Sequence, residues 1–217
     1  MKLYKKIFLI ILISILIAYL IYIFCHNKTL NILVLGDGVS SGQTSYNVDG
    51  LSYNDYLKRY FESEKLQEMG VDFKIGQNEV IVNKCDNLKA VDVTTLVYPG
   101  FPTDLGQPMS VLLTQAEGIS KMEETIWESR IGHYPYLSKM GADIKVEGLV
   151  ATIKGKTALK GTEINATDLR GGAALILAGL IAEGTTNIYD IDYILRGYEN
   201  IINKLSNVGA KISLEEI

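Results

Sequence analysis

The middle of the chain alternates between strand-like and helix-like hydrophobic patterns. Residues 91–95 show the period-two alternation of a half-buried strand, and residues 99–102, with two prolines and a glycine, then interrupt regular structure. A helix with an apolar face is predicted for 103–117, with a threonine and an aspartate as N-cap residues at its start and Gly118 as its left-handed stop. A second strand is predicted for 119–125.

Two further helices are predicted, from 128 to 141 and from 169 to 182. The later helix is apolar on every side, so we expect it to be buried. Asp104 and Arg130 each lie where a predicted strand passes into a helix. Helix N-termini direct free N–H groups toward anions, so corners of this kind collect ligand contacts.

The whole pattern recurs further along the chain. Ala-Glu-Gly at 116–118 recurs at 182–184, which is 66 positions later (182 − 116 = 66). Leu-x-x-Met-Gly-Ala at 137–142 recurs in similar form at 205–210, and a third copy of this element lies at 66–71. The repeated unit reads strand–helix–strand–helix–strand–strand. We therefore predict two nearly complete units and one represented only by its tail.

Composition excludes several classes of protein. The chain has 217 residues, a net charge of −4 and only two cysteines. These values leave no disulfide framework and no cysteine-based metal cluster, and nothing basic indicates nucleic-acid binding. We expect no metal and no cofactor.

The N-terminal region has the pattern of a membrane anchor. Residues 7–25 are nineteen residues without a charge, preceded by Lys2, Lys5 and Lys6. At about 1.5 Å per residue such a helix approaches the roughly 30 Å of a bilayer core. No small-x-small cleavage site follows, so an uncleaved anchor is favoured over a signal peptide. The lysines predict a cytoplasmic N-terminus, with the remainder of the chain outside the cytoplasm.

A glycine-rich turn follows the predicted anchor. The apolar strand at 31–35 leads into GDGVSSG at 36–42, which resembles the first block of the SGNH/GDSL hydrolases. Those enzymes present a nucleophilic serine where Gly38 stands here, so Ser40 or Ser41 would have to be a displaced nucleophile. The Asp-x-x-His block of that family is absent from the sequence. A membrane-anchored esterase remnant is one alternative, and an ordinary turn is the other.

The second half of the chain resembles a different family. The motifs are FPTD, ESR, LSKMGADI, ATDLRGGAALILAGLIAEGTT and RGYENI, at 101–104, 128–130, 137–144, 166–186 and 196–201. In this order they resemble the UDP-N-acetylglucosamine 1-carboxyvinyltransferases, a family of enolpyruvyl transferases. The resemblance covers about residues 65–217. That is the C-terminal part of a protein about twice as long.

The resemblance implies a fold and an activity. It implies an α+β class, the inside-out α/β arrangement of 5-enolpyruvylshikimate-3-phosphate synthase, with buried helices and outer sheets. It implies transfer of enolpyruvyl from phosphoenolpyruvate to the 3-hydroxyl of UDP-N-acetylglucosamine, the first committed step of peptidoglycan synthesis. That family is cytoplasmic, which conflicts with the outward topology predicted from residues 7–25.

The residue types suit this chemistry. Enol-ether formation needs cations for a phosphate and a carboxylate, and a base for the sugar hydroxyl. By the resemblance, Asp104 matches the aspartate that contacts the sugar hydroxyl and serves as base, and Ile126 matches a position whose backbone touches the UDP-sugar. The residues that match the phosphate and enolpyruvyl pocket are Arg130, Asp168, Arg170 and Arg196. Taken singly, each has a structural explanation, as an N-cap or a surface charge.

Several family features are absent from the chain. The active site of the family lies between two domains, and the other domain supplies a catalytic cysteine on a mobile loop. Cys85 lies in a different context and is not that residue. The division we predict is an anchor at 1–28, a hydrolase-like remnant at 29–64 and a partial transferase domain at 65–217. We expect this chain to be inactive alone, and a non-catalytic chimera joined near 64–66 is the remaining alternative.

Overall fold

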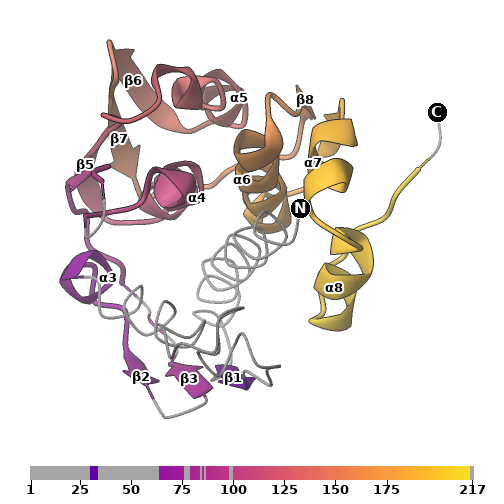
Figure 1. The fold of residues 1–217 in the computed structure, drawn as a ribbon, viewed down its shortest axis with the longest axis horizontal. Coiled ribbons are helices and arrows are strands. Elements are labelled where there is room, and N and C mark those ends of the chain that lie inside the picture. The colour runs from indigo at the N-terminus through magenta and orange to yellow at the C-terminus, as the bar shows by residue number, and fades with distance from the viewer. Residues whose placement is uncertain are drawn as a thin grey trace, which may run out of the picture. The chain divides into compact units, whose positions relative to one another are not determined.

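The computed structural model describes residues 30–33, 64–75, 79–83, 85, 87–97 and 100–215. The predicted anchor at 7–25 and the glycine-rich turn at 36–42 lie outside these ranges. Within them, every helix is too short or too polar to cross a bilayer. The described residues form two compact parts, one running up to Lys89 and one from Ala90 onward (Figure 1).

The larger part opens with a four-stranded sheet. Its strands are β4 (Val93–Thr94), β5 (Gly118–Glu123), β6 (Asp143–Glu147) and β7 (Val150–Gly155). Their order is β4-β5-β7-β6, with β4 parallel to β5 and the other two pairs antiparallel. The predicted alternation at 91–95 is confirmed, because Val91, Val93 and Thr95 are buried and the residues between them are not.

The helices of this first repeat are shorter than predicted. A 3-10 turn, η1 (Thr103–Leu105), precedes α4 (Gly106–Leu113), which ends four residues before the predicted end at 117. The predicted helix at 128–141 is divided into η2 (Glu128–Ile131) and α5 (Tyr134–Lys139). Pro135 occupies the first turn of α5, where its missing N–H is tolerated, so a new helix begins there.

Two local predictions were wrong. Asp104 makes no capping hydrogen bond to η1, and its carboxylate points to arginines instead. Gly118 does not close the helix, because it is the first residue of β5, with φ of +117°. At the end of the helix, the Thr114 hydroxyl donates a hydrogen bond to the Val111 carbonyl oxygen. The N–H of Gln115 donates to the Leu112 carbonyl oxygen, three residues back, so the chain leaves the helix in a tight turn.

The second repeat follows the same order of elements. It contains β8 (Glu163–Asn165), α6 (Leu169–Ile181), β9 (Asn187–Tyr189), α7 (Asp192–Gly197) and α8 (Ile201–Asn207). β8 and β9 pair in parallel, with Ile164 opposite Ile188, as Val93 lies opposite Met122 in the first repeat. Residues 210–215 then run on without helix or ladder pairing.

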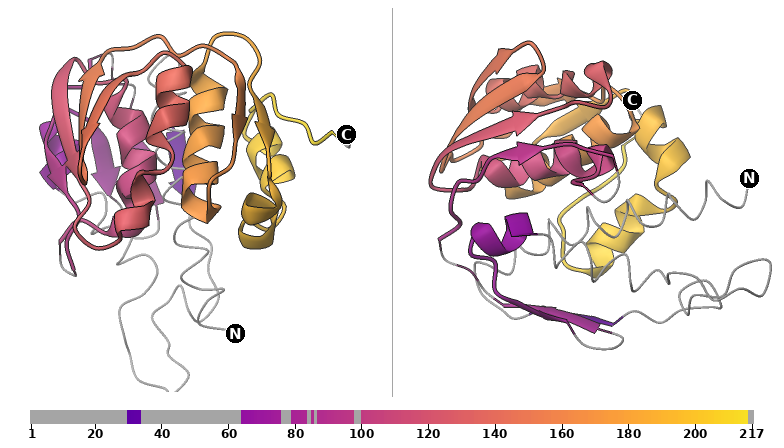
Figure 2. Two further views of the ribbon diagram at one scale, coloured as in Figure 1. Left: turned by 90° about the horizontal axis from the view of Figure 1, so that it is seen from above. Right: turned by 60° about the vertical axis from the view of Figure 1, so that its left-hand side comes forward.

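Helices form the interior of the larger part. All residues of α4 are buried, and so are residues 171–178 of α6, which confirms the expectation for the all-apolar helix. Figure 2 shows α4 and α6 side by side, with the strands of the first repeat outside them. This is the inside-out arrangement expected from the resemblance.

The repeat is visible at the level of single hydrogen bonds. Ala142 donates its N–H to the Leu137 carbonyl at 3.0 Å, and Ala210 donates to Leu205 at 3.0 Å. Val71 makes the same bond to Leu66 at 3.0 Å, after α3 (Glu64–Glu68). The glycine before each donor has a positive φ of +99°, +94° and +82°, respectively. All three helices therefore end in the same left-handed cap, a conformation that glycine adopts without strain.

The smaller part contains the tail of the third copy. β2 (Phe73–Ile75) and β3 (Glu79–Val82) form a hairpin, and β1 (Leu30–Leu33) pairs with the other edge of β3. The order β1-β3-β2 matches β5-β7-β6, and every pair in both sets is antiparallel. A strand from the N-terminal region thus fills the place that β5 fills in the first repeat.

Candidate active site

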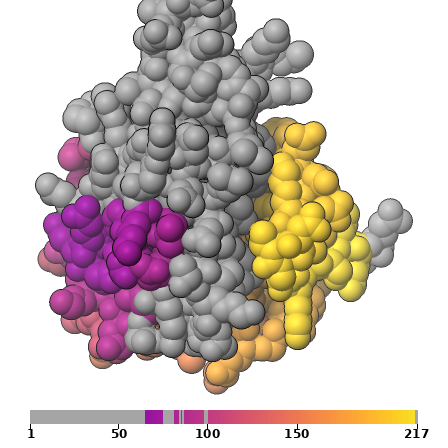
Figure 3. Space-filling model, turned by 90° about the horizontal axis from the view of Figure 1, so that it is seen from below, coloured from indigo at the N-terminus to yellow at the C-terminus, as the bar shows by residue number. Residues whose placement is uncertain are grey.

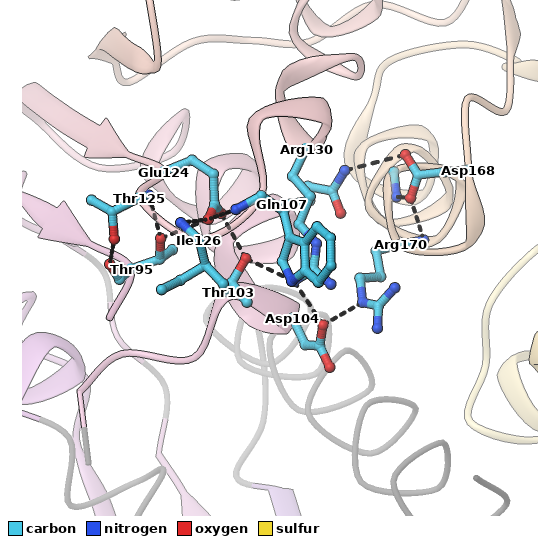
Figure 4. A network of polar contacts seen from close by, with 12 residues as sticks. Thr95, Thr103, Asp104, Gln107, Glu124, Thr125, Ile126, Arg130, Asp168 and Arg170 are labelled. Carbon is cyan, nitrogen blue, oxygen red and sulfur yellow. Dashed lines mark hydrogen bonds and ion pairs between the residues drawn. The ribbon is translucent and has the colours of Figure 1, made fainter. Parts of the chain in front are cut away.

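Asp104 is the centre of a charged cluster that joins three elements. Its Oδ1 lies 2.7 Å from Nη1 of Arg130, in η2, and 2.5 Å from Nε of Arg170, in the first turn of α6 (Figure 4). The three side chains are 12–26% exposed, so the cluster is accessible but largely shielded from water. One carboxylate and two guanidiniums carry a net charge of +1, which favours an anion.

A polar chain holds Arg130 from the other side. Its Nη1 also donates to Thr103 Oγ1 at 2.7 Å, and that hydroxyl donates to Glu124 Oε2 at 2.8 Å. Glu124 is 6% exposed, and its Oε1 accepts from the Thr95 hydroxyl at 2.8 Å. The same oxygen accepts the backbone N–H groups of Ile126 at 2.8 Å and Trp127 at 3.0 Å. Glu124 therefore fixes the backbone turn that leads into η2.

Glu124 was not identified from the sequence. It follows β5 two positions after buried Met122, so the strand alternation places it on the inward face. An acidic residue at an inward position has to be satisfied by hydrogen bonds, because an unpaired buried charge is costly. An acidic residue at an inward-facing strand position was therefore the sequence feature that could have identified Glu124.

Asp168 is fixed at the N-terminus of α6. Its Oδ1 accepts the backbone N–H groups of Arg170 at 2.8 Å and Gly171 at 3.0 Å. Its Oδ2 accepts from Thr167 Oγ1 at 3.0 Å and Gln107 Nε2 at 3.3 Å. Burial alone would raise the pKa of Asp168, but these hydrogen bonds hold the pKa below its ordinary value. Asp168 is thus an ionised helix cap that sets the position of Arg170.

Burial also acts on Arg130. It lowers the pKa of the guanidinium, as does Arg170, and the Asp104 carboxylate opposes both. Arg130 keeps its charge, because the ordinary pKa of an arginine lies far above neutrality. Its guanidinium carbon lies 6.0 Å from the centre of the Trp127 ring, whose side chain is 57% exposed. Trp127 therefore presents an exposed aromatic ring beside Arg130, at the edge of the cluster.

The other predicted site residues are placed differently. Arg196, in the last turn of α7, is exposed and makes no ion pair with Asp104 or Asp168 among the residues described. The N–H of Ile126 is already bound to Glu124, so a ligand contact of its backbone would use the carbonyl oxygen. The structure brings together Asp104, Arg130 and Arg170, with Asp168 beside them.

His133 and Cys85, which are not among the predicted site residues, make contacts of their own. His133 is fully buried, its Nε2 lies 2.7 Å from Ser110 Oγ, and burial lowers its pKa to about 4. The Cys85 thiol lies 3.3 Å from the Gly70 carbonyl oxygen, near the end of the partial repeat. His133 is thus a hydrogen-bonded interior residue, and the Cys85 thiol makes a local contact within the partial repeat.

This arrangement defines a class of protein. Its fold is similar to that of the enolpyruvyl transferase NikO from Streptomyces tendae, at 26% identity and a TM-score of 0.74. That match covers 92% of this chain and 43% of NikO. An EPSP synthase from Acinetobacter baumannii, at 16% identity and a TM-score of 0.63, has the same fold and covers 92% of this chain and 47% of its own.

The family follows from the sequence comparison. The model of EPSP synthase (3-phosphoshikimate 1-carboxyvinyltransferase) matches residues 48–205, and the chain belongs to this family. Two similar relatives are UDP-N-acetylglucosamine 1-carboxyvinyltransferase 2 of Geobacillus kaustophilus and UDP-N-acetylglucosamine 1-carboxyvinyltransferase of Halothermothrix orenii. They are 50% and 56% identical over 70% and 68% of this chain. The chain spans only 36% and 35% of their lengths.

Proposed function

We propose that this chain forms one side of the active site of an enolpyruvyl transferase acting on UDP-N-acetylglucosamine and phosphoenolpyruvate. The observation that carries the proposal is the pairing of Asp104 in η1 with Arg130 in η2 and Arg170 in the first turn of α6. The relatives' names support the choice of sugar nucleotide. The reaction belongs to peptidoglycan synthesis.

The proposed roles follow from the geometry. Asp104 accepts the proton of the sugar 3-hydroxyl through Oδ2, since its Oδ1 faces both arginines. Arg130 and Arg170 bind the carboxylate and the phosphate of phosphoenolpyruvate, for which planar guanidiniums are suited. The hydroxyl oxygen bonds to the enolpyruvyl carbon, and the C–O bond to phosphate breaks, releasing inorganic phosphate.

Asp168, Ile126 and Arg196 have supporting roles in the proposal. Asp168 positions Arg170 through its backbone cap. Ile126 offers its carbonyl to the sugar nucleotide. Arg196 lies exposed on the last turn of α7 and is proposed to contact the phosphate group.

Activity requires groups that this chain does not supply. Because the chain spans about a third of its relatives, the remaining groups have to come from another polypeptide segment. Loss of a catalytic acid or base typically lowers a rate by about 10²–10⁴-fold. We therefore expect no measurable turnover from this chain alone.

Complementation tests the proposal. The purified full chain is mixed with the part of the Geobacillus kaustophilus enzyme that it does not match, and phosphate release is measured with and without UDP-N-acetylglucosamine. Asp104→Asn should lower the sugar-dependent rate by at least 10²-fold. Asp143→Asn, at an exposed strand position, should leave it unchanged. No sugar-dependent release from the mixture, or equal rates for both variants, would refute the proposal.

The N-terminal region carries a second, separate proposal. The glycine-rich turn suggests an SGNH-type esterase remnant at 29–64 behind an anchor at 1–28, with the transferase part at 65–217. A fluorophosphonate probe that labels Ser40 or Ser41 would support it, and absence of labelling would refute it. Fractionation of the expressed chain between membrane and soluble pools tests the anchor.

A further inference from the structure

Thr103 belongs to the FPTD motif, and the roles proposed above leave its side chain without a function. The sequence predicts it as a helix N-cap, yet η1 begins after Pro102 and has no side-chain capping hydrogen bond. Its hydroxyl lies between two charged groups instead, 2.7 Å from Arg130 Nη1 and 2.8 Å from Glu124 Oε2 (Figure 4). Capping of η1 therefore does not explain this side chain.

The direction of the two hydrogen bonds follows from the groups at their ends. A guanidinium can only donate, so the Thr103 hydroxyl accepts from Arg130 and keeps its own hydrogen. That hydrogen goes to Oε2 of Glu124, since a carboxylate accepts. The order of donation is thus Arg130 to Thr103 to Glu124. We name these three side chains the threonine relay.

The far end of the threonine relay is anchored to the turn that carries Arg130. Oε1 of Glu124 accepts the backbone N–H of Trp127 at 3.0 Å, and the Trp127 carbonyl oxygen accepts the N–H of Arg130 at 3.0 Å. The hydrogen bonds therefore form a closed ring, from Glu124 along the backbone to Arg130 and back through Thr103. Glu124 is 6% exposed, so water competes little for the point where the ring closes.

The threonine relay decides which edge of the Arg130 guanidinium meets a ligand. Thr103 Oγ1 and Asp104 Oδ1, on adjacent residues of η1, both lie 2.7 Å from Nη1. Nη1 is thereby committed to η1. The N–H groups of Nε and Nη2 lie along another edge of the guanidinium, and two parallel N–H groups of this kind bind a carboxylate or a phosphate bidentately.

We propose that Thr103 is a positioning residue, which holds Nη1 of Arg130 so that the edge formed by Nε and Nη2 binds an anionic group of phosphoenolpyruvate. The choice of phosphoenolpyruvate rests on the proposed function. The orientation of the guanidinium rests on the hydrogen bonds of the relay alone. Thr103 acts through Arg130 and does not itself touch the substrate.

Rotation of the Arg130 guanidinium tests the relay without any ligand. The rate at which Nη1 and Nη2 exchange places is measured by ¹⁵N NMR on the full chain, and the Arg130 signals are identified by their loss in Arg130→Lys. Thr103→Val keeps the shape of the side chain and removes the hydroxyl, so the rate should rise about tenfold or more, because hydrogen bonds to charged groups are the stronger kind. Thr103→Ser should restore the slow rate. Thr94→Val is the matched control, since the Thr94 hydroxyl also donates to a glutamate, Glu123, at 3.1 Å, outside the relay.

Binding of phosphoenolpyruvate tests the consequence of this orientation. Trp127 is the single tryptophan of the sequence, and its ring centre lies 6.0 Å from the guanidinium carbon of Arg130, so its fluorescence should report an anion bound there. The full chain is titrated with phosphoenolpyruvate. Thr103→Val should raise the Kd about tenfold, and Thr103→Ser should leave it within about twofold. Lys204→Gln is the charge control, because it removes one positive charge from α8, whose surface is seen in yellow in Figure 3, and it should leave the Kd unchanged.

The two measurements separate the relay from the proposed function. Equal rotation rates in the unmodified chain, Thr103→Val and Thr94→Val would overturn the role of Thr103, whatever the chain binds. Faster rotation in Thr103→Val with an unchanged Kd would overturn the link between this orientation and binding. Faster rotation in Thr103→Val, with no binding of phosphoenolpyruvate by the unmodified chain, would support the relay and refute the proposed function.

Discussion

Glu124 and Asp104 are two acidic residues that the fold uses in different ways. Glu124 is buried and accepts four donors, so it holds Thr95, Thr103 and the turn at 126–127 in place. Asp104 is partly exposed and faces Arg130 and Arg170. At this scale, one carboxylate fixes the backbone of the site and the other is the proposed base.

Replacing Glu124 should destabilise the fold. In Glu124→Gln one acceptor oxygen becomes an NH₂ group that faces other donors, so a buried donor loses its partner. We expect the free energy of unfolding to fall by about 1–3 kcal/mol, measured by urea denaturation. Glu123→Gln is the control, because Glu123 is an exposed neighbour whose carboxylate accepts a hydrogen bond from the Thr94 hydroxyl. A loss of equal size in both variants would contradict this role.

His133 should make the protein sensitive to acid. Its pKa is about 4 in the folded protein, against an ordinary value near 6.5. Between these values the unfolded chain binds a proton that the folded chain does not, so stability falls as pH drops from about 6.5 to about 4. The loss should reach about 3 kcal/mol, at 1.36 kcal/mol per pKa unit. Thermal unfolding against pH measures it, and His133→Gln should flatten the curve in that window.

At the scale of elements, the fold is built from one helix ending used three times. The cap at Gly141 and the cap at Gly209 have the same hydrogen bonds and similar positive φ. An added Cβ at Gly141 would have no atom closer than 3.9 Å, and at Gly209 nothing lies within 4 Å. The backbone conformation alone therefore demands glycine at these positions.

The two caps should respond equally to substitution. Gly141→Ala and Gly209→Ala should each lower the free energy of unfolding by about 1–2 kcal/mol, the cost of a left-handed alanine. Gly132→Ala is the control, since Gly132 has φ of −64° and the nearest atom to its added Cβ is 3.7 Å away. If Gly132→Ala costs as much as the other two, the added methyl group and not the left-handed conformation is responsible.

Much of the fold could be predicted from the sequence, because apolar spacing and repeated glycines are local signals. The buried helix at 169–182 and the repeat of 137–142 at 205–210 are examples. The helix end at 113 could not be predicted, since it depends on the Thr114 hydroxyl and on packing. The site was predicted as residue types, but the pairing of Asp104 with two arginines required three elements to meet in space.

At the scale of the whole molecule, stability should be uneven across the two repeats. Residues 143–147 are paired with β7, whereas residues 211–215 have no ladder. Amides without stable hydrogen bonds exchange through local opening and not through global unfolding. Among the described residues, the unevenness follows from this difference in strand pairing and not from the composition of either segment.

Hydrogen exchange should show this difference directly. Amides at 211–215 should exchange within seconds at neutral pH, while those of Asp143–Glu147 should be protected by a factor of about 10³ or more, corresponding to about 4 kcal/mol of local stability. Equal protection of the two segments in the unmodified chain would contradict the expectation.

Among the described residues β9 pairs with β8 alone, and its other edge has a consequence for handling the protein. An unpaired strand edge beside an apolar surface is a template for pairing with the same edge of another molecule. Concentrated solutions of the chain should therefore lose material to β-rich precipitates, at a rate that rises steeply with concentration. The solubility of the chain then depends on one short strand. A lysine on that strand should raise the solubility, because a charge at a strand edge disfavours pairing with another molecule.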